Sequence, residues 1–154
     1  DEKLRRFTYC AGEAMTDALF IAQGLKHVFG RSRPNLTHDG PYSWGHGGFD
    51  IYGPYTSFPS SHATLYFACS TVLGKTLENE WLGDGIGAFA YFSLTGHNHW
   101  GSDMWIGYLL GKSIGNYVWD KQLNNNFSHQ WFIYPTLTIR DDLYVPAVGV
   151  WIIL

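Results

Sequence analysis

The stretch GHNHWGSD at residues 96–103 places a histidine, His99, four residues before a carboxylate, Asp103. A helical pattern continues from it to about Leu123, and positions i and i+4 share one face of a helix. The carboxylate could therefore accept a hydrogen bond from one ring nitrogen and leave the other pointing outward as a nucleophile or base. Taken alone, the pair is better explained as a partly buried histidine satisfied by a nearby acid. A functional interpretation depends on motifs elsewhere in the chain.

Composition limits the function classes. The 154 residues suffice for one domain with a real core, and no linker divides them. A net charge of −3 with 15% charged residues gives no basic field, which argues against nucleic-acid binding. Aromatic residues at 18% and the 18 glycines suit close helix packing and contact with apolar substrates or lipid headgroups. Cys10 and Cys69 fall in apolar helical stretches, so we expect free, buried thiols.

The first predicted helix runs from Lys3 to Phe29, where apolar residues recur at helical spacing. Pro34 disfavours helical geometry at Arg33 and should end the helix before it. Lys26 and Arg33 are separated by about two helical turns, so the two cations can point the same way. The alternative is a solvated basic helix end that interacts with its own carbonyls.

A long loop rich in glycine, proline and aromatic residues follows at residues 35–58. Its aromatic side chains could form a lid or substrate wall, or could fold the loop onto the body. The next predicted helix runs from Ser60 to Leu77, with Ser60 as N-cap and His62 in the first turn. The backbone N–H groups of such a helix start favour a bound anion. A third helix is predicted at about residues 83–94.

The last predicted helix runs from Trp100 to Leu123 and carries Gly107, Gly111 and Gly115, a smooth stripe along which another helix can lie. No run reaches about 18 uninterrupted apolar residues, so the chain is expected to be globular, with attachment to a membrane surface left open. Residues 130–139 and 144–153 look like edge strands joined by a turn at 140–142. Because the sequence starts without methionine and ends on apolar residues, we expect a domain, 1–154, trimmed at one or both ends.

Three separated elements carry complementary chemistry. The cations could hold phosphate oxygens together with the N–H groups of the second long helix, one histidine could attack phosphorus, and the other could protonate the departing alkoxide. Each element is a weak signal alone, but the set indicates phosphoryl transfer.

The motifs Lys26-x6-Arg33-Pro34, Pro59-Ser60-Ser61-His62 and His99-x3-Asp103 together resemble the three-part signature of the type 2 phosphatidic acid phosphatase superfamily. This superfamily includes lipid phosphate phosphatases, bacterial non-specific acid phosphatases and vanadium haloperoxidases. The resemblance spans residues 26–103 and implies an all-α helical bundle, to which the strand-like tail adds a short C-terminal β-hairpin. It also implies hydrolysis of a phosphomonoester or diphosphate without a metal or other cofactor.

The resemblance assigns a role to each residue of the motifs. Phosphate would be bound by Lys26 and Arg33, with hydrogen bonds from Ser60 and from the amide of Ser61. The catalytic residues would be His99 as the nucleophile that forms a phosphohistidine, His62 as the general acid, and Asp103 as the residue that orients the nucleophile. Because His99 must be neutral and His62 protonated, a bell-shaped pH optimum is expected.

Two positions depart from the superfamily pattern. Ser61 stands where glycine is usual, and Ser93 stands where an arginine usually precedes the nucleophilic histidine by six residues. Loss of that arginine removes a phosphate clamp, which costs on the order of a few kcal/mol in a transition state. Arg31 or His97 could substitute for it.

Three alternatives follow from these residues. The first is a phosphate-binding protein without turnover, and the second is a vanadium haloperoxidase, which the missing cation disfavours. The third is a metal site built from His97, His99 and Asp103, although ligands on one helix at this spacing converge poorly. The aromatic loop and the resemblance favour a lipid-type substrate handled at a membrane surface, on the periplasmic or extracytoplasmic side, while the lack of spanning segments favours soluble phosphomonoesters.

Overall fold

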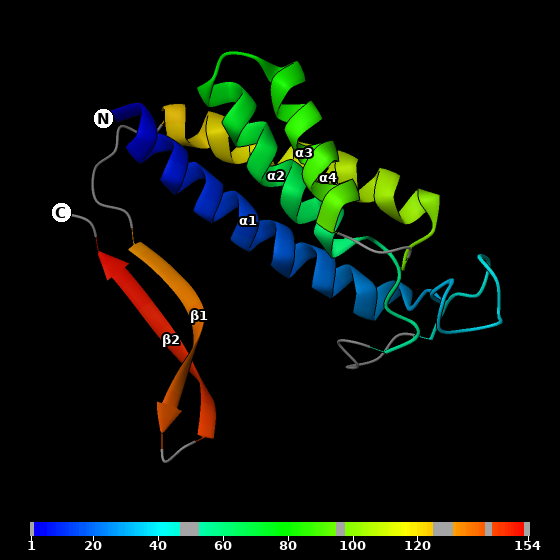
Figure 1. Cartoon of the computed structure of the whole chain (residues 1–154). Helices are drawn as coiled ribbons and strands as arrows, with labels where there is room; N and C mark the ends of the chain where they lie inside the picture. The colour runs from blue at the N-terminus through cyan, green and yellow to red at the C-terminus, as the bar shows by residue number, and fades with distance from the viewer. Residues whose placement is uncertain (1, 47–52, 95–97, 125–130, 141–142, 153–154) are drawn as a thin grey trace. The chain divides into compact units, whose positions relative to one another are not determined.

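The computed structural model describes residues 2–46, 53–94, 98–124, 131–140 and 143–152, and its side chains through Leu123. The described residues contain four helices, which lie mainly in one compact unit, residues 1–121, while Gln122–Leu154 forms a second unit. The four-helix arrangement confirms the all-α fold class expected from the sequence (Figure 1). Within the described residues, no helix is both long and apolar enough to cross a bilayer.

Helix α1 spans Glu2–Phe29 and buries one face made almost entirely of alanine. It ends at Gly30, which has a φ of 51° and donates its N–H to the carbonyl of Lys26 at 2.9 Å. This αL ending suits glycine, which adopts positive φ without steric penalty. The last helical residue, Phe29, is five residues before Pro34, and both predicted cations are close to this helix end in the sequence.

Helices α2 and α3 span Ser61–Thr76 and Glu80–Leu94. The hydroxyl of Ser60 accepts the N–H of Ala63, which confirms the predicted N-cap. Helix α3 begins three residues earlier than predicted because the side chain of Asn79 accepts the N–H of Leu82 and caps it. Helix α2 packs against α1 on one side and α3 on the other.

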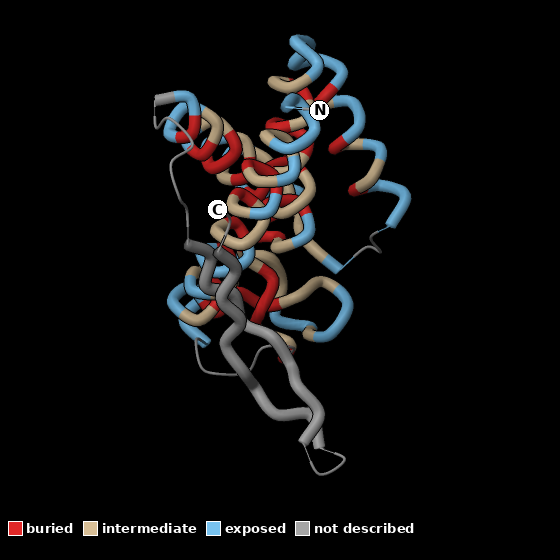
Figure 2. Tube along the Cα trace, turned by 90° about the vertical axis from the view of Figure 1, so that its left-hand side faces the viewer, coloured by how far each residue is buried: buried red, intermediate tan, exposed pale blue. Residues whose placement is uncertain are grey.

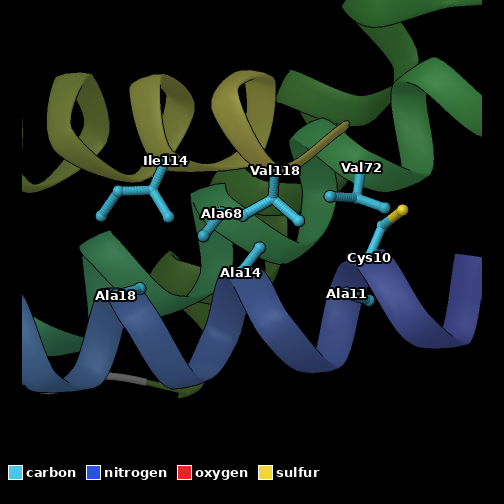
Figure 3. Packing of buried hydrophobic residues seen from close by; sticks show 8 residues of the cluster. All are labelled: Cys10, Ala11, Ala14, Ala18, Ala68, Val72, Ile114 and Val118. Atoms are coloured by element: carbon cyan, nitrogen blue, oxygen red, sulfur yellow. The ribbon is translucent and has the colours of Figure 1, made fainter. Parts of the chain in front are cut away.

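Helix α4 spans Gly101–Asn124 and lies against α2 through its glycines. A Cβ built on Gly107 would lie 2.7 Å from the Cβ of Ala63, and one on Gly115 would lie 2.8 Å from the carbonyl oxygen of Ala68. These distances leave no room for a side chain, so the predicted glycine stripe is a helix contact. The core between α1, α2 and α4 is built from small side chains (Figure 3): Cys10, Ala11, Ala14, Ala18, Ala68, Val72, Ile114 and Val118.

Each helix has a buried side and an exposed side (Figure 2). Buried residues face the interior of the helical unit. Helices α3 and α4 carry exposed large apolar side chains such as Trp81, Phe89, Phe92 and Trp105. Both cysteines are free; Cys10 is buried and Cys69 is partly buried. Burial raises the pKa of both thiols.

The second unit contains a hairpin of β1, Trp131–Arg140, and β2, Leu143–Ile152. The strands are antiparallel and pair from Trp131 with Ile152 to Arg140 with Leu143. Each of the four predicted strand ends differs from these bounds by one residue. Most of the predicted turn, residues 141 and 142, lies outside the described residues.

Candidate functional site

The end of α1 and the starts of α2 and α4 lie at one end of the helical unit (Figure 1), and the predicted site residues Lys26, His62 and Asp103 lie on these helix ends. Backbone hydrogen bonds join these three elements: the N–H of Ser60 donates to the carbonyl of Asp103 at 3.1 Å, and that of Ser57 donates to the carbonyl of Arg31 at 3.0 Å. The loop before α2 is thus held to both neighbours. The site is therefore fixed by backbone contacts as well as by side chains.

The two predicted phosphate-binding cations converge. The ammonium group of Lys26, which is only 3% exposed, donates to the carbonyls of Thr56 and Pro59 at 2.6 and 2.7 Å. The guanidinium of Arg33 donates to the same Thr56 carbonyl at 3.2 Å and to its hydroxyl at 3.1 and 3.2 Å. One carbonyl oxygen is shared by both cations, so the two side chains point the same way, as the seven-residue spacing predicted.

The environment of these cations is electrostatically unusual. Burial, with repulsion from Arg33, lowers the pKa of Lys26 to about 7, although Asp103 opposes the shift. Burial also lowers the pKa of Arg33. Within the described residues neither cation forms an ion pair with a carboxylate. Such a place favours an incoming anion, because a buried charge is stabilised chiefly by a partner of opposite sign.

Two histidines lie within electrostatic reach of the cations. Partial burial, with Lys26 and Arg33, lowers the pKa of His62, which stands in the first turn of α2. Burial, the same two cations and, to a smaller extent, His62 lower the pKa of His99 to about 3. The hydrogen bond to the backbone of Ser57 raises this pKa but does not offset the other effects. His99 is therefore neutral throughout the mildly acidic and neutral range.

The predicted hydrogen bond between His99 and Asp103 is wrong. Helix α4 begins at Gly101, so His99 precedes it and does not share a helical face with Asp103. The ring Nδ1 lies 2.7 Å from the carbonyl oxygen of Ser57 and 3.9 Å from Oδ2 of Asp103. A carbonyl only accepts, so Nδ1 carries the proton and Nε2 of the neutral ring keeps its lone pair.

The carboxylate of Asp103 is fully buried and has other partners. Its Oδ2 accepts the hydroxyl of Ser57 at 2.5 Å and the N–H of Trp100 at 2.9 Å, and its Oδ1 accepts from Nη1 of Arg31. The bond to Trp100 is a capping contact in which a third-position acid reaches back to the residue before the helix. Asp103 thus secures the start of α4 and the loop that contains Ser57.

Arg31, a suggested substitute for the missing arginine, is engaged in contacts within the protein. Its guanidinium donates to Asp103 and, at 2.7 Å, to the hydroxyl of Ser102, while Nε and Nη2 donate to the carbonyl of Pro41 at 3.0 and 2.8 Å. The ring of Trp44 lies 4.5 Å from its central carbon. These contacts engage Nε and both terminal nitrogens of the guanidinium within the protein, and a role of Arg31 as a phosphate clamp stays a prediction. The other suggested substitute, His97, lies outside the described residues.

The three serines of interest occupy different environments. Ser60 is fully buried as the α2 cap, and the hydroxyl of Ser61 is buried without a hydrogen-bond partner in the described part of the chain. Ser93 is exposed near the end of α3. Whether Ser60 and the amide of Ser61 contact phosphate stays a prediction.

The long aromatic loop and the suggested metal site were the two other features interpreted from the sequence. The side chain of Trp44 packs edge-on against Phe29 and Phe58, with ring centroids 6.2 and 5.2 Å apart, so this part of the long loop folds onto the body. Phe49 and Tyr52 of the same loop lie outside the described residues. Among the described residues no group of three His, Cys, Asp or Glu side chains could hold a metal ion, and the suggested metal site included the undescribed His97.

Sequence reasoning missed several residues that build the site. Thr56 and Pro59 hold Lys26 with backbone carbonyls, and Ser57 holds His99 in the same way. Carbonyl groups are common to all residues and give no sequence signal. Asn98, which accepts from Arg33 at 3.4 Å and from Asn35 at 2.8 Å, lay inside the opening motif but was given no role.

The fold and site define an all-α protein with a cationic, two-histidine centre at one end of its helices. A family model described as the PAP2 superfamily matches residues 7–127, and the chain belongs to that superfamily. Membership suggests phosphatase-type activity. Searches of curated proteins and of solved structures returned no match.

Proposed function

We propose that the chain is a metal-independent phosphatase that hydrolyses a phosphomonoester or diphosphate through a phosphohistidine on His99. The observation that carries this proposal is the convergence of Lys26 and Arg33, without a carboxylate ion pair in the described residues, beside two histidines of lowered pKa. This arrangement favours an anion next to a neutral, oriented imidazole. A dianionic phosphate group supplies the negative charge that the cations favour and a phosphorus atom that the neutral imidazole can attack.

The chemistry follows from the protonation states. Nε2 of His99 attacks phosphorus as the bond from phosphorus to the leaving oxygen breaks, and His62 donates its proton to that oxygen. His62 then accepts a proton from water, whose oxygen attacks phosphorus and breaks the phosphorus–nitrogen bond. Lys26 and Arg33 stabilise the negative charge on the non-bridging oxygens in both steps. Phosphate leaves and His99 returns to its neutral form.

The superfamily arginine replaced by Ser93 motivates the competing function of phosphate binding without turnover. Ser93 is exposed and Arg31 is held by Asp103 and Pro41, which supports this competing function. Release of phosphate from an aryl phosphate should be measured for the wild type and for His99→Ala. Equal rates would exclude the enzyme and leave the binding function, which phosphate titration by calorimetry would then test.

An apolar cavity supports a lipid-type substrate. A cavity of about 320 Å³ lies between α2, α3 and α4 and reaches Ala63 and Gly101, the neighbours of His62 and Trp100. It extends along α3 from Asp84 to Phe92, roughly 12 Å at 1.5 Å per residue. Apolar side chains that line it include Phe67, Ala88, Tyr91, Met104 and Tyr108. A hydrocarbon chain attached to a phosphate in the site would be removed from water there.

A substitution that fills this cavity tests the substrate class. Ala88→Phe should lower kcat/KM for long-chain lipid phosphates or polyprenyl diphosphate by about tenfold or more, since exclusion of about two methylenes forfeits roughly 1.6 kcal/mol, and it should leave an aryl phosphate unaffected. Gly85→Phe is the matched control, because a Cβ at Gly85 meets nothing within 4 Å. Equal effects of Ala88→Phe on all substrates would argue for soluble phosphomonoesters.

The exposed aromatic side chains of α3 support work at a membrane surface. Trp81, Phe89 and Phe92 are 89%, 73% and 72% exposed, and aromatic rings are favoured at the lipid–water interface. A periplasmic or extracytoplasmic location rests on the resemblance to bacterial superfamily members alone. Cosedimentation with lipid vesicles, compared between the wild type and Trp81→Ser, would test the membrane contact: equal sedimentation would refute a contribution from Trp81.

A further inference from the structure

We propose that Arg31 is a positioning residue for His99: it holds the carboxylate of Asp103, which holds the hydroxyl of Ser57, whose carbonyl fixes Nδ1 of the histidine ring. The consequence for turnover rests on the proposed function. The arrangement itself rests on the hydrogen bonds from Arg31 to Asp103, from Ser57 to Asp103 and from His99 to Ser57.

Arg31 is built into the protein as a fixed group. It is 5% exposed, donates to one carboxylate, one hydroxyl and one carbonyl, and lies against the rings of Trp44 and Trp100 at 4.5 and 5.8 Å. A buried guanidinium is tolerated when its N–H groups are bonded and a carboxylate balances its charge. Hydrogen bonds to Pro41 and Ser102 and the ion pair with Asp103 hold the Arg31 side chain in this way.

Ser57 connects this pair to the histidine. Its N–H donates to the carbonyl of Arg31 at 3.0 Å, its hydroxyl donates to Asp103 at 2.5 Å, and its carbonyl accepts from Nδ1 of His99 at 2.7 Å. Three contacts of one fully buried residue fix the direction of that carbonyl. The direction of the carbonyl in turn determines which nitrogen of His99 is protonated and which keeps its lone pair.

The charge balance around His99 depends on Arg31. The groups that face the ring are Lys26 from α1, Arg33 from the following loop, His62 from α2 and Asp103 from α4. Asp103 is the one acid of this group, and Arg31 holds one of its oxygens. Without Arg31 the buried carboxylate needs another cation, and the imidazole of His99 lies 3.9 Å from it. Loss of Arg31 should therefore favour a protonated His99.

The arrangement can be measured without turnover by NMR of nitrogen-15-labelled histidine, with the His99 signals assigned by their loss in His99→Gln. The wild type should show the Nδ1–H tautomer and a titration midpoint near 3. Arg31→Met should raise that midpoint by at least one pH unit, and Arg31→Lys, which keeps the charge, should raise it less. An Nε2–H tautomer in the wild type, or an unchanged midpoint in folded Arg31→Met, would overturn the proposal.

Kinetics test the positioning role separately. Arg31→Met should lower kcat on an aryl phosphate by about a hundredfold, as small displacements of a reacting group do, with KM changed less than about twofold. Ser57→Ala, which keeps the carbonyl but removes the hydroxyl, should give a smaller loss of the same kind. A rise in KM without loss of kcat would refute positioning and assign Arg31 to binding. The wild type could hydrolyse no phosphate ester and still show the Nδ1–H tautomer of His99, with the expected rise of its titration midpoint in Arg31→Met. In that case the proposed function fails, and the positioning of His99 by Arg31 stands.

Discussion

Raising the pH should reduce activity in two distinguishable stages. Three ionisations govern the free enzyme: His99 must be neutral, His62 must be protonated and Lys26 must be charged. The pKa of His99 is about 3, that of Lys26 is about 7, and that of His62 lies below its usual 6.5 because of partial burial and the two cations. Activity should therefore be highest in the acidic range.

The slopes of the pH profile follow from these values. Since kcat/KM reports the free enzyme, it should rise through about pH 3, level off, and fall about tenfold per pH unit once His62 loses its proton. Above about pH 7 Lys26 also loses its proton, and the fall should steepen to about a hundredfold per unit. At pH 8 only about a tenth of the molecules would keep a charged Lys26.

The assay is kcat/KM for an aryl phosphate from pH 3 to 9, for the wild type and Lys26→Met. The variant should be slower throughout but should fall only about tenfold per unit above pH 7, because it lacks the second ionisation. Ionisation of the substrate affects both proteins equally and cancels in their ratio. Identical slopes for the two proteins, or an optimum above pH 8, would refute the assignment of these roles.

Two further predictions concern stability. Acidification from about pH 6.5 to 3 should destabilise the fold, because the unfolded chain protonates His99 at its ordinary pKa while the folded chain does so only near pH 3. The urea midpoint of His99→Gln should therefore depend less on pH than that of the wild type. An equal pH dependence of the two midpoints would contradict this prediction. Gly115→Ala should lower the free energy of unfolding by about 1–3 kcal/mol, because the added methyl group overpacks against α2. Gly85→Ala, with open space around its Cβ, should raise it by up to about 1 kcal/mol. Thermal unfolding that ranks the two variants in the opposite order would refute the α2–α4 contact.

Much of the fold could be predicted because its signals are local. Helical periodicity, the N-cap at Ser60 and the turn before Pro34 placed α1 and α2 within about a residue, and the glycine stripe identified the face of α4 that meets α2. The start of α3 was missed because Asn79 acts as a cap in a stretch that looked only polar. Local signals therefore predicted the presence of each helix more accurately than the residue at which it begins.

The site was predictable by residue type and less so by contact. The motifs brought the two cations and two histidines together, but the partner of His99 was predicted wrongly because α4 starts two residues later than a shared helical face requires. The pairing of Arg31 with Asp103 joins distant parts of the chain, and no local pattern indicates it. The roles of Thr56 and Ser57 depend on backbone carbonyls, which every residue has.

The most direct test of the central claim is a search for the phosphoenzyme. After brief mixing with a phosphorus-32-labelled substrate and quenching in alkali, the wild type should carry an alkali-stable, acid-labile label that His99→Ala lacks. His62→Ala, which is slowed in the second step as well as the first, should still acquire the label. Label that persists in His99→Ala, or turnover by the wild type in a single-turnover experiment with no label at any time, would contradict a phosphohistidine at His99.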